Sequence, residues 1–100
     1  MGIHVSHSDG KTRSALTISN LGQQLAHALP ARDWRTIRHL FDGRFADIAH
    51  IPPREAGKIA TVLHKAASDR HMPTNWAYLA RAFADAAQNA ADAREPWVWS

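Results

Sequence analysis

The stretch IPPREAGKIATVLHKAASD, residues 51–69, decides the fold because it carries the signature of an amphipathic helix. Pro53 stands where the first helical residue belongs, and Glu55 follows in the first turn, where the helix dipole favours an acid. Apolar residues then recur at helical spacing on one face, and lysine, threonine and serine occupy the other. We therefore predict a helix that begins at these prolines and runs to about residue 69.

Three more helices are predicted on either side of this one. Residues 20–29 open with a sequence resembling a capping box, and Pro30 ends their apolar pattern. Residues 32–42 place Trp34, an isoleucine, a leucine and a phenylalanine on one side of a second helix. A last helix starts at about residue 74 and keeps an apolar stripe to Ala90.

Extended segments are predicted mainly at the two ends of the chain. Residues 2–7 alternate apolar and polar side chains, and residues 15–18 alternate again, which predicts two short strands. Residues 44–51 show no clear period and are expected to be irregular. In the tail, Trp97 and Trp99 share one face of an extended chain, so we expect residues 96–100 to dock as a strand beside residues 2–6.

The predicted fold is an α-dominated α+β domain spanning residues 1–100, with four short alanine-rich helices packed on a small sheet formed by the N- and C-terminal segments. The chain has nineteen alanines, as many as its Leu, Ile, Val and Phe residues together. Because alanine favours helices and its small side chain lets helices approach closely, we expect close helix packing around a few large anchors. The absence of cysteine excludes disulfides and thiolate zinc sites. No apolar run approaches the ~20 residues that span a bilayer, so we expect a cytoplasmic protein without a membrane segment.

Metal and catalytic sites are not expected. The chain has seven histidines, but only His4, His7 and Asp9 lie close enough in sequence to suggest a shared ligand set, and no HExxH motif occurs. The chain has two glutamates, no GxSxG or SxxK motif, and glycines too dispersed for a phosphate-binding loop. We therefore predict a non-enzymatic protein without cofactor or metal.

Basic residues gather around the second predicted helix and favour nucleic-acid binding. Arginine exceeds lysine nine to three, and the net charge is +3. Helices 20–29 and 32–42 resemble a helix-turn-helix pair, but Pro30 occupies its turn and Trp34 suits a core anchor better than a base-reading side chain. The alternative is a solvated helix face whose arginine stems cover apolar surface. The candidate nucleic-acid contacts are Arg32, Arg35, Arg38, His39 and Arg44.

A protein interface is the other interpretation. Tryptophan, tyrosine and arginine are enriched where interfaces are strongest, which makes Trp97, Trp99 and Tyr78 candidates if they are exposed. The alternative is that the tryptophans are the large core residues of an alanine-rich domain. A homodimer is also compatible with so small a core.

Three stretches carry a resemblance to known sequences. They are Leu21-Gly22 with Leu29-Pro30 and Trp34, then IPPREA (residues 51–56), and the closing PWVWS (residues 96–100). Together they resemble small uncharacterised proteins of actinobacteria and their phages, a resemblance that implies no activity or cofactor. The sequence alone therefore predicts a small binding or regulatory protein acting through an unidentified protein partner, with DNA or RNA binding through residues 32–44 as the alternative.

Overall fold

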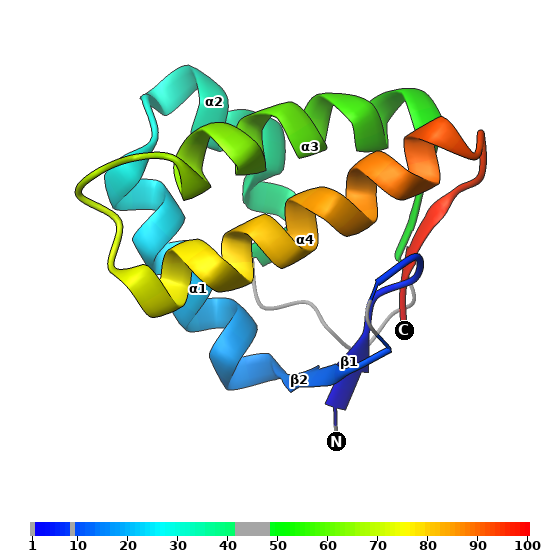
Figure 1. Ribbon diagram of the computed structural model, residues 1–100, viewed down its shortest axis with the longest axis horizontal. Coiled ribbons are helices and arrows are strands. Elements are labelled where there is room, and N and C mark those ends of the chain that lie inside the picture. Colours follow the sequence, from blue (N-terminus) through cyan, green and yellow to red (C-terminus); the bar gives the residue numbers. More distant parts are fainter. Residues whose placement is uncertain (1, 9, 42–48) are drawn as a thin grey trace.

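The computed structural model describes residues 2–8, 10–41 and 49–100, and helices dominate this part of the chain (Figure 1). No helix in these ranges is long and apolar enough to cross a membrane. The described elements are, in chain order, β1 (Gly2–His4), β2 (Thr12–Ser14), α1 (Ala15–Ala28), α2 (Ala31–Ile37), the 3-10 helix η1 (Arg38–Phe41), β3 (Ala49–Ile51), α3 (Pro53–Ala67), α4 (Thr74–Asp92) and β4 (Trp97–Trp99).

Helices α3 and α4 lie side by side along most of their length and form the centre of the domain (Figure 1). Their facing surfaces are rich in buried alanine, which lets the two backbones approach closely. Helix α1 packs against α4, and larger side chains fill the space between the elements. The largest fully buried side chains are Trp97, Ile18, Leu21, Leu25, Ile37, Ile59 and Leu63. The predicted α-dominated α+β fold with four helices is confirmed.

The strands form two small antiparallel sheets that meet at the C-terminal tail. Strand β1 pairs with β2, and β3 pairs with β4. A bridge between Val5 and Trp99 connects them, and the backbones of His4 and Ser100 exchange two hydrogen bonds of 2.8 Å. The tail therefore docks beside residues 4–6, as predicted, and its other edge is covered by β3.

Two sequence-based expectations about local structure are wrong, and a third, the helix over 32–42, holds only in part. Residues 15–18 are not a strand but the first turn of α1, because the Ser14 side chain caps the helix by accepting the Thr17 N–H at 3.1 Å. Within the segment 44–51, which was expected to be irregular, residues 49–51 form β3 because Trp97–Trp99 supplies their hydrogen-bonding partners, and residues 44–48 lie outside the described residues. The helix expected over 32–42 is an α-helix only to Ile37 and then tightens into η1.

Candidate functional site

Helix α2 and η1 present a row of basic side chains to solvent. Pro30 precedes α2 with a φ of −58°, close to the helical value, and Ile37 is buried on the inner side. Because Ile37 anchors one face, the opposite face of this short segment is exposed. The exposed basic residues are Arg32, Arg35, Arg38 and His39.

Helix α3 runs antiparallel beside α2 and adds a second basic row. The Lys65 ammonium donates to Asp33 at 2.8 Å, and His39 Nε2 lies 3.9 Å from Glu55 Oε1. The start of α2 therefore lies near the end of α3, and η1 lies near its beginning. Thr36 of α2 lines one surface hollow together with Arg54 and Lys58 of α3. We call Arg32, Arg35, Arg38, His39, Arg54 and Lys58 the α2–α3 basic face.

The positive charge of the protein is concentrated on these elements. Residues 31–41 and 53–67 contain six Lys and Arg side chains and two acidic ones, a net +4 against +3 for the whole chain. Lys65 and His39 have the acidic neighbours described above. The remaining cations of the two helices form no ion pair with an acid in the described ranges; they are Arg32, Arg35, Arg38, Arg54 and Lys58. All five of these residues are exposed.

Two hollows interrupt the basic face. The first, which we call the Trp34 cleft, has a volume of about 480 Å³ and is lined by Trp34, Arg38, His39 and Phe41. The second has about 470 Å³ and is lined by Thr36, Pro52, Arg54, Glu55 and Lys58. His39 lines the first and Glu55 the second, so their 3.9 Å contact marks the boundary between the two hollows.

The floor of the Trp34 cleft is tied to the core by a chain of aromatic contacts. The rings of Trp34 and Phe41 are stacked at 6.2 Å with an interplanar angle of 28°. Phe41 meets the edge of Trp99 at 5.8 Å, and Trp99 contacts Phe83 and Trp97. Trp34 is half-buried, whereas Phe41 and the inner rings are buried. The two outer rings of this packed cluster, Trp34 and Phe41, thus border the cleft.

Gly22 of α1 fixes the position of Phe41. A Cβ placed on Gly22 would lie 2.7 Å from the Phe41 Cβ, closer than side chains pack. Only glycine therefore lets η1 lie against α1 in this position, and η1 carries both the floor of the cleft and two of its basic residues.

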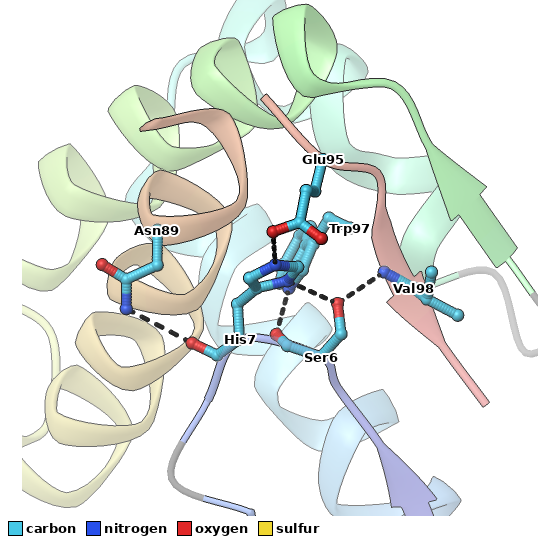
Figure 2. Close-up of polar contacts among 6 residues, drawn as sticks. All are labelled: Ser6, His7, Asn89, Glu95, Trp97 and Val98. Carbon is cyan, nitrogen blue, oxygen red and sulfur yellow. Dashed lines mark hydrogen bonds and ion pairs between the residues drawn. The ribbon is translucent and has the colours of Figure 1, made fainter. Parts of the chain in front are cut away.

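A second polar cluster joins the two chain ends, and sequence reasoning did not identify it. The His7 ring lies between Ser6 and Glu95, with Nδ1 2.9 Å from the Ser6 Oγ and Nε2 3.5 Å from the Glu95 Oε1 (Figure 2). Ser6 Oγ also accepts the Val98 N–H at 2.9 Å. We call this group the terminal clamp; its members are Ser6, His7, Asn89, Glu95, Trp97 and Val98 (Figure 2).

The terminal clamp holds an unusual backbone conformation. His7 has a φ of 61°, in the left-handed region that few non-glycine residues adopt. Its carbonyl accepts from the Asn89 amide at 3.3 Å, and the preceding carbonyl, that of Ser6, accepts the Trp97 indole N–H at 3.1 Å. Side chains from α4 and β4 therefore hold this turn in place.

The order serine, histidine, carboxylate in the clamp resembles that of hydrolase triads. Here, however, the Glu95 carboxylate is 63% exposed and lies 3.5 Å from the His7 ring, whereas the carboxylate of a triad is buried and hydrogen-bonded to the histidine. The clamp contacts account for the docking of the tail, so we interpret it as a structural element.

The other candidate residues lie apart from the basic face. Trp97 and Trp99 are 0% and 4% exposed, so they are core residues and the condition for their role at an interface is not met. Tyr78 is 71% exposed. Arg44 and Asp9 lie outside the described residues. In the part of the chain that the structure describes, no three His, Asp or Glu side chains are grouped as metal ligands.

Sequence reasoning identified the α2 half of the basic face and missed the α3 half. Arg54, Lys58, Thr61 and Lys65 recur every three or four residues, a pattern that was visible as the polar face of a helix. What the pattern could not show is that α3 lies antiparallel beside α2. The Asp33–Lys65 pair, 32 residues apart in sequence, is one of the contacts that shows this arrangement.

Comparison with known proteins gives one family. The family described as Domain of unknown function (DUF7739) matches residues 6–100. The matched region contains the terminal clamp, α2 and α3 in full. No curated protein and no solved structure gave a match.

Proposed function

We propose that the chain, which belongs to the DUF7739 family, is a non-enzymatic protein that binds nucleic acid through the α2–α3 basic face. The observation that carries this proposal is the set of five cations on adjacent helices without acidic partners among the described residues. Phosphate groups supply the complementary charge, and neutralising them releases counterions, which drives binding.

The residue types on this face suit phosphate recognition. Four of the six members are arginines, whose planar guanidinium groups form paired hydrogen bonds to phosphate oxygens. The fifth cation, Lys58, borders the hollow between the two helices together with Arg54. A strand laid along this hollow would meet Arg54 and Lys58 of α3 and Thr36 of α2, beside the Glu55 carboxylate.

A protein partner is the second candidate function. The exposed Tyr78 on α4 favours it, because tyrosine is enriched at the centre of protein interfaces. We rank this function below nucleic-acid binding because the two tryptophans expected at such an interface are buried. A homodimer through the same side of α4 would bury Tyr78 as well.

The setting of this function is part of the proposal. We propose that the protein acts in the cytoplasm, because chromosomal and phage nucleic acid are accessible there. The alanine- and arginine-rich composition agrees with an actinobacterial or phage source, since both residues have GC-rich codons.

A charge-removal pair tests the proposal. Fluorescently labelled single- and double-stranded oligonucleotides are titrated with protein at several salt concentrations, and anisotropy gives Kd. The triple variant Arg32→Gln, Arg35→Gln, Lys58→Gln should bind at least about 100-fold more weakly. Its affinity should also fall less steeply as the salt concentration rises. The control variant Arg70→Gln, Arg81→Gln, Arg94→Gln removes the same charge from exposed positions outside α2 and α3 and should bind much as the original chain does.

Two results would contradict nucleic-acid binding through this face. One is the absence of binding to either oligonucleotide at low salt. The other is an equal loss of affinity in both triple variants, which would show that only overall charge matters.

A further inference from the structure

The Trp34 cleft has a composition that phosphate binding alone does not require. Phosphate contacts use cations and hydrogen-bond donors, whereas this cleft combines two basic side chains with an indole and a phenyl ring. Trp34 is half-buried and stacks on Phe41 at 6.2 Å, so one part of its ring is packed and another borders the hollow. Aromatic rings bordered by arginine are the surfaces on which unpaired bases stack.

We infer that the Trp34 cleft receives an unpaired nucleobase stacked on Trp34, with Arg38 and His39 beside it, so that the ligand of the basic face is single-stranded nucleic acid. This inference rests on the proposed function and names its ligand class. Bases paired in a duplex present only their edges in the grooves, so they cannot stack on a side chain without being flipped out. The cleft therefore favours a single strand.

The packing around Trp34 supports this role. The aromatic chain from Trp34 through Phe41 to Trp99 holds the ring from behind, which lowers the entropy cost of presenting a stacking surface. The cleft volume of about 480 Å³ lies in the range of ligand sites. The hollow that contains Arg54 and Lys58 adjoins the cleft through the His39–Glu55 contact, so phosphates flanking the stacked base would meet these cations.

The test separates bases from phosphates. An oligothymidylate of about twelve nucleotides is compared with an abasic oligomer of the same length and with a duplex. The oligothymidylate should bind about tenfold more tightly than the abasic oligomer, and more tightly than the duplex per phosphate. In Trp34→Leu this preference should disappear, while affinity for the abasic oligomer is retained. Trp76→Leu changes a half-buried tryptophan of α4 outside the cleft and should keep the preference.

A second measurement does not depend on the stability of Trp34→Leu. In Trp76→Phe, the remaining indoles are Trp34 and the buried Trp97 and Trp99. Oligothymidylate should quench the fluorescence of this variant, whereas the abasic oligomer should not, because only stacking brings a base against Trp34.

The outcomes distinguish this inference from the proposed function. Equal, salt-dependent affinities for oligothymidylate and abasic oligomer, or tighter binding of the duplex, would overturn base stacking and leave phosphate binding by the basic face intact. No binding of any oligomer at low salt would overturn both.

Discussion

The terminal clamp and the Trp34 cleft on the basic face each contain a tryptophan and a histidine, but the two regions differ in burial and in hydrogen bonding. In the clamp, Trp97 is fully buried and its indole N–H has an acceptor; the His7 ring lies between two polar partners. Trp34, which borders the cleft, is only partly buried, and five cations of the basic face form no ion pair with an acid among the described residues. Polar groups that are satisfied internally stabilise a fold, whereas exposed groups without internal partners can bind a ligand. The contrast indicates a stabilising role for the clamp and supports the binding role proposed for the basic face.

The largest expected effect is at the clamp tryptophan. Trp97→Ala removes a fully buried indole and should lower the free energy of unfolding by about 3–5 kcal/mol, a large share of the stability of a domain this size. Trp34→Ala should cost clearly less, because part of that ring already faces solvent. Urea denaturation followed by circular dichroism measures both. Equal losses for the two variants would contradict the division between the regions.

The two tail tryptophans provide a finer control. Trp97 donates its indole N–H to the Ser6 carbonyl, whereas the buried Trp99 Nε1 has no acceptor among the described residues. Replacement by phenylalanine should therefore be more costly at Trp97 than at Trp99, since only the first removes a hydrogen bond.

The next effect concerns the support of the Trp34 cleft. Gly22→Ala would place a Cβ 2.7 Å from that of Phe41, so η1 must shift, and we expect a loss of about 1–3 kcal/mol despite the better helix propensity of alanine. The same substitution at Gly57 in α3 meets only Ala91 at 3.6 Å and should stabilise the protein by about 0.5–1 kcal/mol. Thermal unfolding compares the pair, and equal shifts would show that Gly22 does not position Phe41.

The elements that the sequence predicted well are those whose signals are local. The α3 helix was predicted to begin at two prolines and runs over Pro53–Ala67, because its initiating residues and its apolar face lie in one stretch. The start of α1 was missed because the spacing of Leu16 and Ile18 suited a strand. Ser14 is a good N-cap residue, and its side chain accepts the N–H of Thr17, three residues later. This capping residue was the local signal that could have identified the start of α1.

The features that the sequence could not give depend on contacts between distant segments. Strand β3 is three residues long and forms only because β4 pairs with it. The clamp joins His7 to Glu95 across 88 residues, and the second half of the basic face depends on the position of α3 beside α2. The sequence showed which side chains were basic, aromatic or polar. Which of them lie next to one another depends on how distant segments pack.

A smaller effect tests the clamp through its hydroxyl. Ser6→Ala removes the acceptor of the Val98 N–H and the partner of His7 Nδ1, which should cost about 1 kcal/mol. Hydrogen exchange of the Val98 amide should accelerate, and oligonucleotide affinity should stay unchanged. Ser68→Ala, at an exposed position after α3, is the control and should change neither the stability nor the hydrogen exchange of the Val98 amide. A loss of oligonucleotide affinity in Ser6→Ala would contradict a purely structural clamp.

The smallest expected effect changes the basic face without breaking it. The Asp33 carboxylate accepts from Lys65 at 2.8 Å and so neutralises one cation of α3. Asp33→Asn keeps an oxygen acceptor but removes the charge, so oligonucleotides should bind about two- to fivefold more tightly at ~0.1 M salt, with under about 1 kcal/mol change in stability. Asp85→Asn is the matched control. Asp85 also lies 2.8 Å from a basic side chain of α3, that of His64, the residue before Lys65, but Asp85 itself lies on α4. Since added salt screens exposed charges, the difference between the two variants should shrink as salt rises; a gain that is equal in both, or independent of salt, would argue against a local role of the α2–α3 surface.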